Sequence, residues 1–226
     1  MRIYIGHDPE EQAAYEVACK SLARVSKIRP ELLSSERLSA AGLLNRSVDL
    51  RGQRYDLVSN APASTDFAVS RFLTPLLCQQ GWALFVDCDV VFLGDPAELL
   101  NIADPGKAVH VVKHSHRGSG WKMVNQVQTD YPRKNWSSVM LFNCDHPANR
   151  RLSLRDVNER PGRDLHALYW LHDEEIGELP AEWNWLVSVQ EQPESPKIAH
   201  FTLGGPWLEG WQPAEHDDIW LGARDG

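Results

Sequence analysis

The chain has 226 residues, of which 42% are hydrophobic and 24% charged, and its formal net charge is −8. This is the composition of an ordinary globular protein, and the length suits one large domain better than two small ones. The acidic balance disfavours a nucleic-acid-binding protein, which needs a basic face. It is compatible with a phosphate-containing ligand, because a bound metal ion can supply positive charge.

The cysteines and the apolar segments bear on where the protein resides. None of the four cysteines forms a CxxC pair, and each lies among apolar residues, which favours buried free thiols. Free thiols predict a reducing compartment, so we expect a cytoplasmic protein. Residues 1–12 become acidic too early for a signal peptide. The longest apolar run, residues 82–93, is too short to span a bilayer, while contact with a membrane surface stays open.

The N-terminal segments predict a strand that leads into a helix. Residues 2–6 have strand character and end in glycine, and residues 9–25 carry apolar side chains at helical spacing. Further along, continuous apolar runs predict strands and periodic segments predict helices. The expected strands lie at residues 28–34, 82–87, 107–112, 137–144 and 197–203, and the expected helices at 64–81, 95–100, 146–159 and part of 162–179. This order predicts a Rossmann-like α/β domain with a mostly parallel, mixed central sheet flanked by helices.

Two aspartates interrupt the most apolar segment, FVDCDVVFLGDP. Side chains two apart on a strand point to the same face, so Asp87 and Asp89 converge if the strand continues through them. Paired carboxylates at the carboxyl end of a strand suit a divalent cation. A pair of solvated acids at a strand end is the alternative that this spacing alone leaves open. Asp95, which precedes Pro96, is instead expected to cap the next helix.

A third ligand is available near the C-terminus. In KIAHFTLGGPW, His200 lies among apolar residues on a predicted strand, where a histidine is either a core residue or a ligand. Gly204 and Gly205 would let the backbone approach a phosphate closely. Two carboxylates and one imidazole favour Mn²⁺ over Mg²⁺.

These motifs together resemble the family 8 glycosyltransferases. The resemblance covers about residues 1–211 and rests on an ordered set: SRF, FVDCDVVFLGDP, SSVMLFN, WLHDEEIG and AHFTLGGPW. It implies the GT-A fold, a UDP-sugar donor and transfer with retention of configuration. Residues 1–226 would then form one domain, with a donor-binding half at about 1–115 and a half that completes the metal and acceptor sites at about 116–226.

The resemblance implies a role for each matching residue. Asp87, Asp89 and His200 would bind Mn²⁺ or Mg²⁺, with Asp87 also near the donor ribose, and Asp8 would contact the uracil. The expected donor-binding residues are Gly6, Asp8, Arg71, Asp87, Gly205 and Trp207. The family often carries a lysine after the late histidine that grips the diphosphate. TLGGPWLEGW has none, so Trp207 or backbone amides would have to take its place.

The expected catalytic residues are Arg71, Asp173 and Glu174. A guanidinium suits a donor sugar or a phosphate, although the spacing around Arg71 equally fits an exposed helix charge. Asp173 or Glu174 could stabilise a cation-like anomeric carbon or act as a nucleophile. The alternative interpretation is that both residues belong to a solvated acidic run at a helix end. The basic segment 113–122, KHSHRGSGWK, is either a lid over the donor phosphates or a solvated loop.

We therefore predict a metal-dependent, retaining hexosyltransferase that uses a UDP-sugar. The acceptor could be lipopolysaccharide, another cell-surface glycan, a protein or a small metabolite. A sugar nucleotidyltransferase is one alternative, although it would normally show a glycine-rich, basic loop where this chain has the acidic GHDPEEQ. The other alternative is a non-catalytic protein that binds carbohydrate or nucleotide sugar through the tryptophan-rich C-terminal part.

Overall fold

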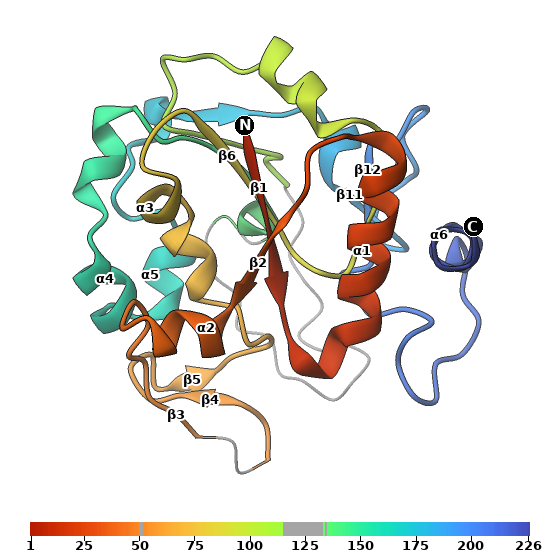
Figure 1. The fold of residues 1–226 in the computed structure, drawn as a ribbon, viewed down its shortest axis with the longest axis horizontal. Coiled ribbons are helices and arrows are strands. Elements are labelled where there is room, and N and C mark those ends of the chain that lie inside the picture. The colour runs from red at the N-terminus through yellow and green to blue at the C-terminus, as the bar shows by residue number, and fades with distance from the viewer. Residues whose placement is uncertain (50–51, 115–132, 134) are drawn as a thin grey trace.

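The computed structural model describes residues 1–49, 52–114, 133 and 135–226, and its centre is a six-stranded sheet (Figure 1). The strands are β1 (Arg2–His7), β2 (Glu31–Ser34), β6 (Trp82–Val86), β8 (Val109–Val111), β9 (Val139–Asn143) and β10 (Ile176–Glu178). Their order is β10-β8-β9-β6-β1-β2. β1 runs parallel to β2 and β6, and β10 runs parallel to β8, whereas β9 is antiparallel to both of its neighbours. The predicted α/β class with a mostly parallel, mixed sheet is confirmed.

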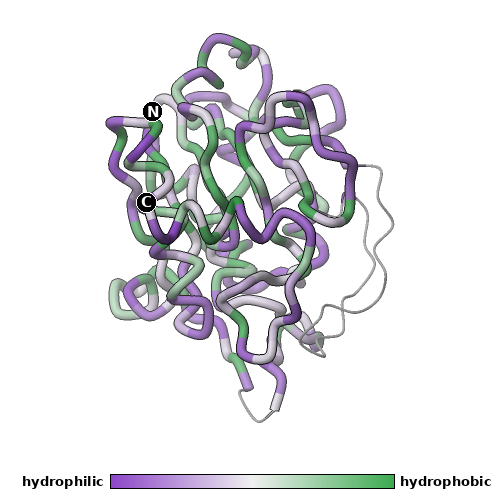
Figure 2. Tube along the Cα trace, turned by 90° about the vertical axis from the view of Figure 1, so that its right-hand side faces the viewer, coloured by the Kyte–Doolittle hydropathy of each residue, from purple (hydrophilic) through white to green (hydrophobic). Residues whose placement is uncertain are grey.

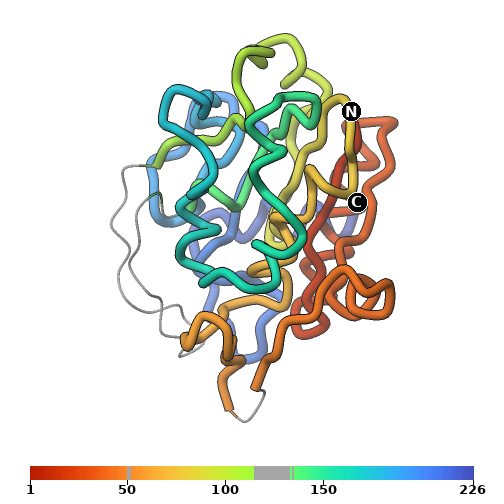
Figure 3. The backbone as a smooth tube through the Cα atoms, turned by 90° about the vertical axis from the view of Figure 1, so that its left-hand side faces the viewer, coloured from red at the N-terminus to blue at the C-terminus, as the bar shows by residue number. Residues whose placement is uncertain are grey.

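Two small sheets accompany the central one. One has the order β11-β12-β7 and consists of β7 (Val90–Phe92), β11 (Trp185–Leu186) and β12 (Ile198–His200). The other contains β3 (Val48–Asp49), β4 (Tyr55–Asp56) and β5 (Ala61–Pro62), which lie at the lower edge of the molecule in Figure 3. β12 is antiparallel to β7, with His200 opposite Val90, so this register brings His200 beside the segment that precedes β7.

Helices cover the central sheet. Figure 1 shows α1 (Gln12–Val25) to one side of β1 and α3 (Thr74–Cys78) to the other. α1 follows a 3-10 turn at Pro9–Glu11, packs against β1 and β7, and also contacts the C-terminal α6 (Asp217–Asp225). The remaining helices are α2 (Ser35–Ala40), α4 (Leu154–Glu159) and α5 (Gly162–His166). Hydrophobic residues follow the strands inside, and hydrophilic residues dominate the outer loops (Figure 2). The predicted amphipathic helix at residues 9–25 is thus confirmed, with a 3-10 first turn.

Two predicted helices are broken into shorter pieces. The helix predicted at 64–81 begins only at Ser70, as a 3-10 turn (Ser70–Leu73) followed by α3. Pro75 lies in the first turn of α3, where its missing N–H costs nothing, so it starts a new helix there. The helix predicted at 146–159 consists of a 3-10 turn (Pro147–Arg151) and α4. Ser153 and Asp156 form a capping box at the start of α4, which explains the separate beginning.

The structure also bears on several smaller predictions. The segment predicted as helical at 162–179 contains α5, a 3-10 turn (Asp173–Glu175) and the strand β10. All four cysteines are free thiols. In the part of the chain that the structure describes, no helix is long and apolar enough to cross a membrane. The expected lid at 113–122 falls outside the described residues after His114.

Candidate active site

Three residues that the sequence suggested as metal ligands meet at the carboxyl end of β6. One ligand atom from each of Asp87, Asp89 and His200 lies within 4.8 Å of the other two. Nε2 of His200 is 3.3 Å from Oδ1 of Asp89. Two ligands at a right angle on one small divalent cation are about 3.1 Å apart, given metal–ligand distances near 2.2 Å. The donor set and its spacing therefore fit a divalent cation.

The two aspartates converge because of a turn between two sheets. β6 ends at Val86, and β7 begins at Val90 in the sheet that also contains β11 and β12. The convergence was expected from a strand that continues through Asp87 and Asp89, but these residues lie between the two strands. The N–H of Asp87 donates to the carbonyl of Ser138 (3.0 Å), and the carbonyl of Asp89 accepts from the N–H of Phe201 (2.9 Å). A backbone hydrogen bond to the C-terminal half of the chain thus fixes each acid in place.

Cys88, between the two acids, packs into the protein interior. Its side chain is fully buried, and its thiol donates to Oε2 of Glu11 at 3.3 Å. Burial and the neighbouring carboxylates raise the pKa of the Cys88 thiol well above its usual range. The protonated thiol can pack and donate a hydrogen bond, but it is a poor nucleophile.

Arg71 lies directly beside the acids. A guanidinium N–H group is 2.8 Å from Oδ1 of Asp87 and also donates to the carbonyl of Ser137 at 2.9 Å. The guanidinium lies over the rings of Phe67 and Phe85, at 5.2 and 5.1 Å from the ring centres. The residue is 5% exposed, which excludes the alternative of an exposed helix charge. Arg71 is thus a buried cation held against a candidate metal ligand.

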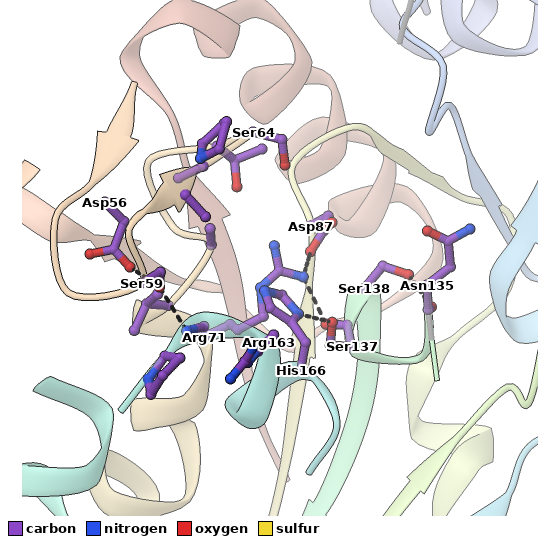
Figure 4. A pocket seen from close by; sticks show the side chains of 18 of the residues that line it. Asp56, Ser59, Ser64, Arg71, Asp87, Asn135, Ser137, Ser138, Arg163 and His166 are labelled. Atoms are coloured by element: carbon purple, nitrogen blue, oxygen red, sulfur yellow. Dashed lines mark hydrogen bonds and ion pairs between the residues drawn. The ribbon is translucent and has the colours of Figure 1, made fainter. Parts of the chain in front are cut away.

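A cavity of about 310 Å³, with a wall of mixed polar and apolar groups, opens next to Arg71 and Asp87. Figure 4 shows Arg71, Asp87, Ser137 and His166 side by side, with Asp56 and Ser59 farther along the wall. The cavity is lined by hydroxyl and amide side chains, among them Ser59, Asn60, Ser64, Thr65, Ser137 and Asn135. None of the described residues that line it is a phenylalanine, tyrosine or tryptophan. Such a wall can bind a polyhydroxylated ligand by hydrogen bonds.

His166 is a lining residue that sequence reasoning missed. Its Nδ1 is 2.7 Å from the hydroxyl of Ser137. Desolvation and the nearby Arg71 lower the pKa of His166 well below its usual range, so its imidazole is neutral at physiological pH. His166 lies in a segment predicted only as partly helical, and no local pattern identified it.

Asp8 and Gly6 are engaged inside the protein. Oδ1 of Asp8 accepts from the N–H of Glu10 (3.0 Å), and Oδ2 accepts from the N–H of Asp66 (2.8 Å) and from Arg54 (3.0 Å). A Cβ atom on Gly6 would lie only 2.5 Å from the ring of Phe67. Neither residue is among those that line the cavity. Both residues therefore stabilise the local fold, and their expected contacts with the UDP-sugar donor remain predictions.

The other expected donor and catalytic residues also lie outside the described cavity wall. The side chain of Asp173 is 87% exposed and forms an ion pair with Arg133, and Glu174 is exposed next to it. The indole of Trp207 packs against Phe201 and Trp220. Gly205 allows this packing, because a Cβ atom there would clash with the Trp207 ring.

One curated protein resembles the chain over nearly its whole length. The sequence is 43% identical to "Protein CDI" of Arabidopsis thaliana over 229 aligned residues, which cover 97% of this chain and 84% of that protein. The chain belongs to the family of protein CDI. No protein-family model matches the sequence.

Solved structures with the same fold are glycosyltransferases. The bifunctional glycosyltransferase WbbM matches with a TM-score of 0.63 at 14% identity, and GlyE of Streptococcus pneumoniae TIGR4 with 0.60 at 12%. Each match covers 100% of this chain, which spans 49% of the WbbM chain and 60% of the GlyE chain. The galactosyltransferase LgtC, solved with donor and acceptor sugar analogues, matches with 0.60 at 16% identity over 99% of this chain and 95% of its own. The fold of this protein is therefore the GT-A fold of these enzymes.

Proposed function

We propose that this CDI-family protein is a metal-dependent glycosyltransferase that moves a hexose from a UDP-sugar to an acceptor hydroxyl with retention of configuration. One observation carries the proposal: Asp87, Asp89 and His200 converge beside the buried Arg71, and Arg71, Asp87 and His200 line the same cavity. This arrangement lies at the carboxyl end of a strand in a GT-A fold, where open α/β sheets bind ligands. The expected donor half supplies both acids and Arg71, and the other half supplies His200.

The chain's own residues would place the donor in two parts. Asp87, Asp89 and His200 would hold a divalent cation, preferably Mn²⁺, which when bound stabilises the negative charge that develops on the departing diphosphate. Arg71, next to Asp87, can donate hydrogen bonds to the sugar or to a phosphate oxygen. The cavity, at about 310 Å³, is within the size range of small-molecule sites, and its hydroxyl and amide groups match a hexose.

The carboxylates near the cavity favour same-face attack over a covalent intermediate. The described carboxylates that line it are Asp56 and Asp87. Asp56 forms a buried ion pair with Arg46 at 2.6 Å, and Asp87 is paired with Arg71. A carboxylate held in this way is a weak nucleophile. Asp173 and Glu174 would reach the transferred sugar only if their 3-10 turn moved towards the cavity.

The proposal is tested by a donor screen. The purified protein is incubated with individual UDP-sugars and Mn²⁺, UDP release is recorded, and NMR of the product gives the anomeric configuration. Release with one donor and retained configuration support the proposal. Pyrophosphate formation from UTP and a sugar phosphate would instead identify a nucleotidyltransferase. Calorimetric binding of free sugar, without binding of UDP in the presence of Mn²⁺, would identify a carbohydrate-binding protein.

A further inference from the structure

We propose that Asn184 is the positioning residue that fixes the tautomer and the ring orientation of His200 for metal binding. Asn184 is completely buried and ends the 3-10 turn Ala181–Asn184, directly before β11. Its Oδ1 is 3.0 Å from Nδ1 of His200. The inference rests on the proposed function only in that a divalent cation binds at Asp87, Asp89 and His200.

The neighbours of Asn184 determine which way its amide group points. Nδ2 of Asn184 is 2.9 Å from the hydroxyl of Ser138, 3.0 Å from Nε2 of His114 and 3.3 Å from the carbonyl oxygen of Asn135. A carbonyl oxygen can only accept, so the amino group must lie on that side. The Ser138 hydroxyl donates its own hydrogen to the same carbonyl at 2.8 Å, and its oxygen therefore accepts from Asn184. The amide oxygen is left to face His200.

This orientation dictates where His200 carries its proton. An amide oxygen can only accept a hydrogen bond, so Nδ1 of His200 must be the protonated nitrogen. The lone pair of the neutral ring is then on Nε2, the atom that lies 3.3 Å from Oδ1 of Asp89. Nε2 is thus the nitrogen that can bind a cation together with the two carboxylates. The same contact also stops rotation of the ring.

The backbone keeps Asn184 and His200 in register. β11 starts immediately after Asn184 and pairs in parallel with β12, with Leu186 opposite His200. Asn135 and Ser138 belong to the segment that enters β9, whose Ser138 carbonyl also accepts from the N–H of Asp87. One short segment therefore positions both a carboxylate ligand and the residue that orients the imidazole ligand.

The test compares two buried asparagines. Asn184→Leu removes the acceptor for His200, and Mn²⁺ affinity measured by electron paramagnetic resonance should fall about 10- to 100-fold, the usual effect of losing a partner of a ligating histidine. Asn149→Leu is the matched control, because Asn149 is also buried and its amide donates to the carbonyls of Ala108 and Asn143. This control should lose stability but keep its Mn²⁺ affinity.

A second measurement uses the wild-type protein, so it does not require that any variant folds. In the wild-type protein, ¹⁵N NMR of the imidazole should show Nδ1 of His200 protonated, and addition of Zn²⁺ should shift the Nε2 signal. The mild variant Ser138→Ala should weaken Mn²⁺ binding less than Asn184→Leu does. A wild-type His200 that is protonated only on Nε2 would overturn the proposal, as would unchanged Mn²⁺ affinity in a folded Asn184→Leu protein. None of these measurements needs sugar transfer, so Mn²⁺ binding without UDP release would contradict the proposed function alone.

Discussion

The guanidinium of Arg71 lies 2.8 Å from the carboxylate of Asp87, and both side chains face the same cavity. The two side chains are 6% and 13% exposed, so little water screens the pair. Removing one partner of a buried ion pair leaves an uncompensated charge, which is strongly destabilising. Arg71 therefore stabilises the fold around Asp87 and presents a cation to the ligand.

This relationship predicts different results for two substitutions of Arg71. Arg71→Met should lower the free energy of unfolding by about 3–5 kcal/mol, because Asp87 stays buried without its partner. Arg71→Lys keeps the charge and should cost less stability. It loses the planar group that reaches the Ser137 carbonyl and lies over the rings of Phe67 and Phe85, so UDP release should fall about tenfold or more. Urea unfolding and a UDP-release assay measure both effects, and full activity of Arg71→Lys would refute a need for the guanidinium.

Gly6 provides a test of packing under the site. Gly6→Ala places a methyl group against the ring of Phe67, and the free energy of unfolding should fall by about 1–3 kcal/mol. Gly222→Ala is the control, since a Cβ atom there meets nothing within 4 Å and α6 should be unchanged or slightly more stable. Urea unfolding compares the two. Equal stability of Gly6→Ala and the wild type would mean that Phe67 can move aside.

Thr65 tests whether the cavity wall binds a ligand. Its hydroxyl is buried and has no hydrogen-bond partner among the described residues, and the residue lines the cavity. Thr65→Val should therefore leave the free energy of unfolding unchanged or raise it, while weakening binding of the UDP-sugar in calorimetry. Thr74→Val is the contrasting control, because that hydroxyl donates to the carbonyl of Arg71 (2.8 Å), and its loss should cost about 1 kcal/mol. Donor affinity that survives in Thr65→Val would remove the hydroxyl from the binding site.

His110 makes stability depend on pH. It is buried in β8, and its Nε2 accepts from the N–H of Asp104 at 2.9 Å. Burial lowers the pKa of His110 from its ordinary value of 6.5. The unfolded chain therefore binds a proton that the folded protein resists, so stability should fall as pH drops below about 6.5. Urea unfolding between pH 7.5 and 5 should show a shallower decline for His110→Gln, and identical slopes would assign the pH dependence to other groups.

The sequence pattern predicted those elements of the fold that depend on residues close together in the chain. The apolar run at 82–87 and the helical spacing at 9–25 depend on neighbours in the sequence, and they formed β6 (Trp82–Val86) and, after a 3-10 turn, α1 (Gln12–Val25). The end of β6 at Val86 was not predictable, because it depends on pairing of the next segment with β12, far along the chain. The acids still converge, but through a turn rather than by alternation along one strand.

The candidate site was predictable only in part for the same reason. The spacing of Asp87 and Asp89, with His200 in an apolar strand, pointed to the metal ligands, because ligand chemistry is visible in residue type. Asn184 gave no such signal, since a buried asparagine acquires its role only from His200 and Ser138 in space. The exposed position of Asp173 and its ion pair with Arg133 likewise gave no signal in the sequence.

The most direct test of the central claim is UDP release from the preferred UDP-sugar by three proteins: the wild type, Asp89→Asn and Asp95→Asn. Asp95 caps the next helix through the N–H of Ala97 (3.0 Å), and asparagine caps equally well, so Asp95→Asn controls for the substitution itself. The wild type and Asp95→Asn should release UDP only with Mn²⁺, and release should stop in a chelator. Asp89→Asn should be slower by about 100-fold or more, as expected when charge stabilisation at the diphosphate is lost. Undiminished release by the wild type in a chelator, or by Asp89→Asn with Mn²⁺, would contradict a metal-dependent transferase.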